Sequence, residues 1–255
     1  MMTRLSVNLN KIALLRNSRE SGLPSVVRAA EVSLAAGAAG ITVHPRPDER
    51  HIRPADVSDL SRLLHGHPDA EFNIEGNPFH NLISIALAAV PDQCTLVPDE
   101  VGALTSSHGW SLPDQSRVLE PMIRTLKDAG IRVSLFMDPL PGSMRLAREL
   151  GADRVELYTE SYARAPDDLA LLARYVESAQ AAREAGLGVN AGHDLNLSNV
   201  GRFVAAAAPI DEVSIGHALV GDALEMGLAA AVRAYVEALA SGGPGHTRQA
   251  RQARS

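Results

Sequence analysis

The sequence is poor in cysteine and has no long apolar run, and each of these shortages excludes a class of protein. Its only cysteine is Cys94, so no disulfide framework and no cysteine metal site can form within the chain. Cys94 lies in an apolar run, which predicts a buried, inert thiol. No stretch reaches the roughly 18 apolar residues of a membrane span, and the start, MMTRLSVNLN, lacks the layout of a secretory signal. We therefore expect a soluble, cytoplasmic protein.

Net charge narrows the possible partners. The formal charge is −6, and the only lysines among the 255 residues are Lys11 and Lys127. Nucleic-acid-binding proteins usually present a basic face to the phosphates, so we expect no nucleic-acid partner. Small anions are not excluded by this charge. A chain of this length can bury roughly three-quarters of its unfolded surface in one core.

Short β-type runs alternate with longer Ala/Leu-rich runs along the whole chain, which is typical of βα units around a parallel sheet. Eight runs are predicted to be strands: 5–10, 40–45, 71–76, 93–98, 131–138, 154–159, 187–193 and 212–217. They begin about 30 residues apart on average, the usual length of a βα unit. The pattern predicts a single (β/α)8 TIM barrel over residues 1–240. Residues 241–255 are rich in Gly, Pro and polar residues, which predicts a disordered tail.

Between these runs, four helical segments end in glycine, the usual signal for a helix stop. They are VVRAAEVSLAAGAAG, MIRTLKDAG, MRLARELGAD and AAREAGLG. Each is followed directly by a predicted strand, so we expect short αβ loops here.

Polar and apolar residues alternate along the predicted strands. Residues Leu5, Val7 and Leu9 share one face of the first strand, and Ser6 and Asn8 share the other. The same alternation places Thr42, His44, Asn73, Glu75, Glu156 and Tyr158 on the polar face of other strands. The apolar face must pack on the helices, so the polar face points into the barrel. Because barrel interiors are usually filled with branched apolar residues, a polar interior indicates a site.

Active sites of this fold lie at the C-terminal ends of the strands. The candidate residues there are Asn8, Asn10, Lys11, His44, Arg46, Glu75, Glu156, Thr159, His193, Gly216 and His217. Three of them are histidines and two are glutamates. A single buried polar residue is as often structural as catalytic, but this convergence favours catalysis. A glutamate facing the interior should have a raised pKa unless a cation pairs with it.

Arginines and glycines in the adjoining loops suit phosphate. Arg16 and Arg19 follow the first strand, and Arg46, Arg50 and Arg53 follow the second. The alternative is a solvated face with ion pairs to Asp48, Glu49 and Asp56, which is equally plausible for Arg50 and Arg53. The last two strands run into AGHDLN and IGHALVGDAL, each of which leads into a predicted helix, and backbone N–H groups at the start of such a helix could hold a phosphate. These glycines could also serve only tight turns.

Metal ligation is not indicated at the strand ends. The only HxH motif, His65 and His67, lies before the third strand, on the opposite side of the barrel. We therefore expect no metal.

Seven motifs together resemble the pyridoxine 5′-phosphate synthase family, from about Leu5 to Leu239. They are VNLNKIALLRNSR, GITVHPRPDERHI, EFNIEG, LVPDE, VSLFMD, NAGHDLN and IGHALVG. The resemblance implies a TIM barrel that condenses 3-amino-2-oxopropyl phosphate with 1-deoxy-D-xylulose 5-phosphate. The products would be pyridoxine 5′-phosphate, phosphate and water, formed without metal or organic cofactor. It also implies a homo-oligomer, since members form octamers.

The resemblance also implies roles for individual residues. His44 and Glu75 would accept protons, His193 would donate one, and Glu156 would stabilise transition states. Two substrate-binding sets follow: Arg46, His51 and Thr105 for the deoxyxylulose phosphate, and Asn8, Arg19, Gly216 and His217 for the amino-oxopropyl phosphate.

The sequence departs from the family pattern in three places. Asn10 and Lys11 stand where many members have Asp-His, so these substrate contacts would involve different groups. Asp194 replaces a glycine whose backbone contacts phosphate in the family. The segment after the fourth predicted strand, beginning DEVGALTSSHG, differs in length and composition.

Two other functions are compatible with the same residues. A phosphosugar isomerase, epimerase or Schiff-base aldolase is one, and Lys11 is the only lysine placed for an aldolase. A non-catalytic barrel that serves as a binding or assembly module is the other. It would have little reason to keep the convergent histidines and glutamates in a buried interior.

Overall fold

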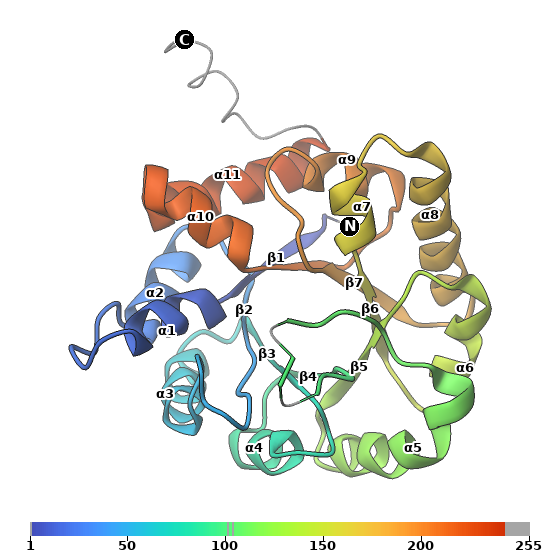
Figure 1. Cartoon of the computed structure of the whole chain (residues 1–255), viewed down its shortest axis with the longest axis horizontal. Coiled ribbons are helices and arrows are strands. Elements are labelled where there is room, and N and C mark those ends of the chain that lie inside the picture. The colour runs from blue at the N-terminus through green and yellow to red at the C-terminus, as the bar shows by residue number, and fades with distance from the viewer. Residues whose placement is uncertain (1, 101, 104, 243–255) are drawn as a thin grey trace.

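A computed structural model describes residues 2–100, 102–103 and 105–242 and contains a closed barrel of eight parallel strands in chain order (Figure 1). The strands are β1 (Arg4–Asn8), β2 (Gly40–Val43), β3 (Glu71–Gly76), β4 (Gln93–Leu96), β5 (Arg132–Met137), β6 (Arg154–Tyr158), β7 (Gly188–Gly192) and β8 (Glu212–Ile215). The predicted (β/α)8 barrel is therefore confirmed. Ser241 still belongs to the last helix, and the rest of the predicted tail, residues 243–255, lies outside the described residues.

Helices surround the strands (Figure 1). They are α1 (Asn10–Asn17), α2 (Val26–Ala35), α3 (Pro54–His65), α4 (Leu82–Ala89), α5 (Leu112–Asp128), the 3-10 turn η1 (Pro141–Ser143), α6 (Met144–Glu149), α7 (Glu160–Arg164), α8 (Leu169–Glu184), α9 (Val200–Ala206), α10 (His217–Met226) and α11 (Leu228–Ser241). The short helices α1, α7 and α10 directly follow β1, β6 and β8. A helix after β8 was expected from the IGHALVGDAL segment and is present. Helices α1 and α7 were not predicted, because the strand pattern runs into them without a break. None of the helices described here is both long and apolar enough to span a membrane.

The four glycine stop signals are confirmed at the ends of α2, α5, α6 and α8. Gly37, Gly130, Gly151 and Gly186 have φ angles of 105°, 77°, 96° and 80°. These left-handed conformations are open to glycine at little cost, so each helix ends where the sequence predicts.

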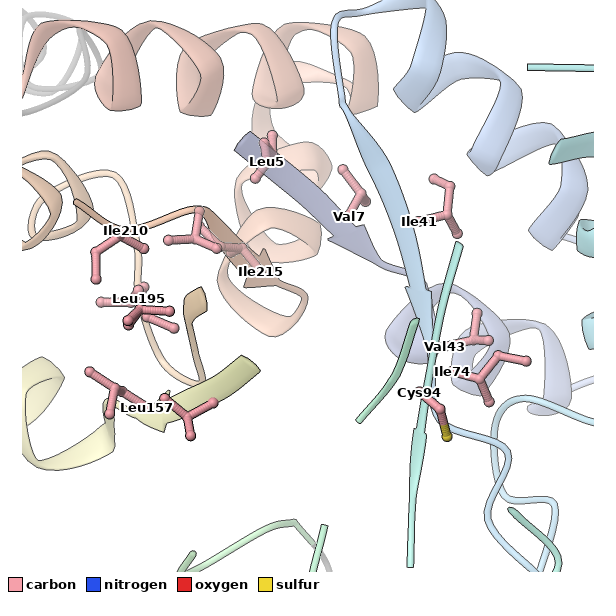
Figure 2. Close-up of a cluster of buried hydrophobic side chains, with 14 of the residues drawn as sticks. Leu5, Val7, Ile41, Val43, Ile74, Cys94, Leu157, Leu195, Ile210 and Ile215 are labelled. Carbon is pink, nitrogen blue, oxygen red and sulfur yellow. The ribbon is translucent and has the colours of Figure 1, made fainter. Parts of the chain in front are cut away.

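Apolar side chains of the strands pack outward against the helices. Figure 2 shows Leu5, Val7, Ile41 and Val43 in this layer, and each is at most 2% exposed. Cys94 lies in the same layer and is fully buried, which confirms the predicted buried thiol. Burial raises the pKa of this thiol, so the reactive thiolate is disfavoured.

Polar side chains fill the barrel interior, but those near its N-terminal end do not form a site. Both Arg4 and Arg132 donate to the Glu71 carboxylate, at 2.6 and 2.5 Å. Farther along, the Ser6 and Thr42 hydroxyls lie 2.7 Å apart. This part of the interior is a closed hydrogen-bond and ion-pair network. The expectation that interior polarity indicates a site is thus correct only for the C-terminal end.

Candidate active site

A cavity of about 730 Å³ lies at the C-terminal mouth of the barrel. All four predicted catalytic residues line it: His44, Glu75, Glu156 and His193. So do nine of the predicted substrate-binding residues: Asn8, Asn10, Lys11, Arg46, His51, Thr105, Asp194, Gly216 and His217. Strand ends, helix starts and loops that are distant in sequence therefore meet at one place.

Arg19 is the exception among the predicted substrate-binding residues. It is exposed, just beyond the end of α1, and it does not line the cavity. The sequence predicted a place at the mouth for Arg19, because the loop that follows a strand was expected to stay there. Instead α1 carries the chain away from β1 before Arg19 is reached.

His44 and Glu75 form the centre of the site. Nδ1 of His44 lies 4.0 Å from Oε2 of Glu75, and both side chains are at least 89% buried. Asn10 fixes the backbone here, since its Oδ1 accepts the His44 N–H at 2.9 Å. Asn8 in turn accepts the Asn10 N–H and donates to Glu75, at 3.0 and 3.5 Å. The two asparagines thus fix the positions of His44 and Glu75 relative to each other.

Asp99 also belongs to this centre, although the sequence analysis did not single it out. It is buried, pairs with the Arg46 guanidinium, and its Oδ2 lies 3.9 Å from Nε2 of His44. Ser106 donates to Oδ2 at 3.1 Å, so the carboxylate also holds the loop after β4. The signal was available in the LVPDE motif, where a carboxylate directly follows a strand end.

The interior glutamates divide as expected between paired and unpaired groups. Burial, followed by the charges of Glu156 and Asp99, raises the pKa of Glu75 well above its ordinary value. Burial and then Glu212 raise the pKa of Glu156 to about 8. In contrast, the pKa of Glu71 is lowered despite its burial, because three arginines surround it. Glu156 is therefore mostly protonated at neutral pH.

Both histidines on the β2 side are neutral at pH 7. Burial, then the positive charge of Arg46, lowers the pKa of His44 well below its ordinary value. The same two causes lower the pKa of His51 to about 4. Nδ1 of His51 accepts the Ile52 N–H at 2.9 Å, which agrees with a neutral ring. A neutral imidazole can accept a proton.

Val97, Phe136 and Tyr158 form an apolar wall of the cavity, and they form a separate buried cluster. The rings of Phe136 and Tyr158 lie 5.3 Å apart. Alternation already placed Tyr158 on the inner face, and extending it to β4 and β5 would have found the other two residues. An apolar wall limits water around the reacting groups.

The predicted arginine cluster separates into different roles. Arg16 pairs with Asp56 and donates to the His51 carbonyl, so it is structural. Arg50 pairs with Asp48 and also lines the cavity. Arg53 begins α3 as its N-cap residue. Of the described charged residues, Lys11 faces the cavity with no carboxylate within 4.0 Å of its ammonium.

The last two strands supply the remaining predicted residues. His193 and Asp194 follow β7, and Thr105 contacts His193 from the loop after β4. Gly216 is the N-cap residue of α10 and His217 is its first residue, and both line the cavity. A side chain at Gly216 would lie 3.1 Å from Asn8, so glycine permits this close approach. The described residues contain no group of three or more His, Cys, Asp or Glu side chains that could hold a metal ion.

This geometry is accompanied by extensive similarity to known proteins. The profile of the family described as pyridoxal phosphate biosynthesis protein PdxJ matches residues 5–241. The chain belongs to this family. A pyridoxine 5′-phosphate synthase of Albidiferax ferrireducens is 55% identical over 250 residues, covering 95% of this chain and 99% of the relative. One of Xanthomonas axonopodis pv. citri is 53% identical over 253 residues, covering 95% and 98%. These relatives are enzymes by name.

Solved structures of low sequence identity share the fold. A protein from Aquifex aeolicus superposes with a TM-score of 0.63 at 16% identity, covering 93% of this chain and 92% of that one. Tryptophan synthase from M. tuberculosis gives a TM-score of 0.62 at 16% identity, covering 94% and 92%. At this identity the likeness concerns the barrel alone.

Proposed function

We propose that this protein is a pyridoxine 5′-phosphate synthase, which condenses 3-amino-2-oxopropyl phosphate with 1-deoxy-D-xylulose 5-phosphate. The products are pyridoxine 5′-phosphate, phosphate and water. One observation carries the proposal: His44, Glu75, Glu156 and His193 line a single cavity together with basic and amide side chains. Imine formation, dehydration, phosphate loss and ring closure require several proton transfers at one place.

The proposed acid–base roles follow the protonation states. His44 is neutral at pH 7 and acts as a proton acceptor. Glu75 is the second acceptor, and its raised pKa makes its ionised form a stronger base than an exposed carboxylate. Glu156, with a pKa of about 8, is a neutral acid that can donate a hydrogen bond to charge developing on the substrate. His193 acts as the proton donor.

Substrate binding is proposed for the residues around this centre. Arg46, His51 and Thr105 hold the deoxyxylulose phosphate, and Lys11, which has no carboxylate of the described residues within 4.0 Å, adds a cation. Asn8, Gly216 and His217 hold the amino-oxopropyl phosphate at the start of α10, where backbone N–H groups attract anions. Arg19 would reach this phosphate only if the segment after α1 moved toward the mouth.

Asn10 is proposed to act on the substrate mainly through His44, whose N–H it holds. Its family counterpart is a carboxylate, and the amide keeps an oxygen acceptor in the same place. The enzyme is further proposed to be a cytoplasmic homo-oligomer, with the octamer of its family, and to need no cofactor.

The test is to incubate the purified protein with both phosphorylated substrates and a chelator, and to measure pyridoxine 5′-phosphate and released phosphate. Both should appear, and Glu75→Gln and His193→Ala should lower kcat by about 100-fold or more. His67→Ala is the matched control, because His67 is exposed and lies outside the cavity. Glu75→Gln with full turnover would refute the role of Glu75 as a base.

Absence of product from folded protein would overturn the proposal. Borohydride trapping with a ketose phosphate would then test the aldolase alternative, since a covalent adduct would form on Lys11. Binding of both substrates without turnover or adduct would instead indicate a binding module.

A further inference from the structure

The turn after β7 has an unusual backbone. His193 and Asp194 have φ angles of 84° and 62°. Residues other than glycine rarely adopt this left-handed region, and asparagine and aspartate tolerate it better than most. Two such residues in succession at the mouth of a cavity require contacts that hold them there.

Thr159 holds the backbone of this turn. Its hydroxyl lies 2.7 Å from the carbonyl oxygen of Gly192 and 2.6 Å from that of His193. Its N–H also donates to the Gly192 carbonyl, at 3.0 Å. Thr159 is fully buried, so these bonds face no competition from water. The direction of the His193 side chain is thereby set by the fold.

Side chains then occupy both ring nitrogens of His193. Nδ1 lies 3.0 Å from Oδ2 of Asp194, and Nε2 lies 2.8 Å from Oγ1 of Thr105. The Tyr158 ring packs edge-on at 5.0 Å. An ionised carboxylate can only accept a hydrogen bond, so Nδ1 must carry the hydrogen. In the neutral ring, Nε2 then accepts from the Thr105 hydroxyl.

We propose that Asp194 is a positioning residue that holds Nδ1–H of His193, so that Nε2 is the atom that takes up and releases the catalytic proton. When His193 acts as an acid, the Nε2–H bond breaks, the proton passes to an oxygen of the departing group, and the electron pair stays on the ring. The Asp194 carboxylate remains on Nδ1–H and stabilises the imidazolium before transfer. The assignment of the hydrogen to Nδ1 rests on the contacts of His193 alone. The role of Nε2 in proton transfer rests on the proposed function.

The resemblance places glycine at this position, so the Asp194 carboxylate is a departure of this chain from the family pattern. Replacing it with glycine keeps a residue that tolerates the left-handed backbone. Asp194→Gly should therefore fold, and it removes the side chain with its carboxylate while the left-handed backbone stays accessible. Asp194→Asn keeps the shape but can present either a donor or an acceptor to Nδ1. Together the two variants distinguish the effect of the carboxylate from the effect of the backbone conformation.

Ring ¹⁵N spectra of histidine-labelled protein test the tautomer at a pH about two units above the ordinary histidine pKa. Comparison with His193→Gln identifies the His193 signals. The wild type should show a protonated Nδ1 and an unprotonated Nε2, whereas Asp194→Gly should shift toward the Nε2–H form. In the same variants kcat should fall roughly 10- to 100-fold while KM changes less than about threefold, because the substrate contacts remain.

Asp167→Asn is the control, since Asp167 is an exposed carboxylate paired with Arg202. It should change neither the spectrum nor the kinetics. An Nε2–H tautomer in the wild type, or an unchanged tautomer and kcat within twofold in Asp194→Gly, would overturn the proposal. A wild type without activity but with the expected spectra would refute the proposed function and leave the hold of Asp194 on Nδ1 confirmed.

Discussion

The carboxyl group of Glu156 occupies the space where a side chain at Gly192 would lie. Glu156 is on β6 and Gly192 ends the neighbouring strand β7. A methyl carbon at position 192 would be only 2.3 Å from Oε1 of Glu156 and 3.3 Å from the Ser214 carbonyl oxygen. The absence of a side chain on one strand therefore makes room for an interior acid on the next.

Gly192→Ala should displace the Glu156 side chain and strain the C-terminal end of β7. Overpacking of a buried site typically costs about 1–3 kcal/mol of unfolding free energy. The effect on kcat should be larger than the effect on stability, because the Glu156 carboxyl group is displaced. Urea unfolding and kcat measure the two effects. Gly142→Ala is the control, since nothing lies within 4 Å of a methyl group at that exposed glycine. Equal activity of both variants would contradict the assignment.

The stability of Glu156→Gln should depend on pH. The folded-state pKa of about 8 lies above the ordinary value of 4.5, so the wild type loses stability as pH rises between these two values. Glutamine resembles the protonated acid and carries no such penalty. At about pH 9 the variant should be roughly 1–4 kcal/mol more stable than the wild type, and near pH 4.5 the difference should vanish. A difference independent of pH, measured by urea unfolding, would disprove the raised pKa.

The pH dependence of kcat/KM should reflect Glu75. As a base Glu75 must be ionised, and burial and neighbouring carboxylates raise its pKa. The value of kcat/KM should therefore still be rising with pH above the range in which an exposed carboxylate is already fully ionised. His44 does not cause this rise of kcat/KM with pH, because its lowered pKa leaves it neutral in that range. A plateau reached at about pH 5, as for an exposed carboxylate, would argue against Glu75 as the base.

Asp99→Asn should lower the free energy of unfolding more than the same substitution in an exposed ion pair. Arg46 and Asp99 are each only 5% exposed, so removing the carboxylate leaves a buried cation. The expected loss is about 3–5 kcal/mol of unfolding free energy, together with a raised KM for the phosphorylated substrates. Asp48→Asn breaks the more exposed pair with Arg50 and should cost less than about 1 kcal/mol. Equal losses in thermal or urea unfolding would show that burial of the Arg46 pair is not decisive.

Local chemistry made the barrel predictable from the sequence. Strand alternation, glycine stop signals and repeat length recur in each unit, and each depends on residues close together in the chain. The same alternation placed His44, Glu75 and Glu156 on the inner face. Strand direction and the rule for parallel barrels then placed them at one mouth. None of these inferences needs a contact between distant residues.

Tertiary structure alone decided which polar groups are partners, because pairing depends on the register and closure of the barrel. Glu71 and Glu75 lie on one face of β3. Arginines from β1 and β5 pair with Glu71, whereas no arginine in the described part of the chain pairs with Glu75. Asp99 reaches Arg46 across 53 residues. The sequence determined the scaffold and the side of each strand that faces inward. Closure of the barrel determined which buried charges are neutralised and which are left with shifted pKa values.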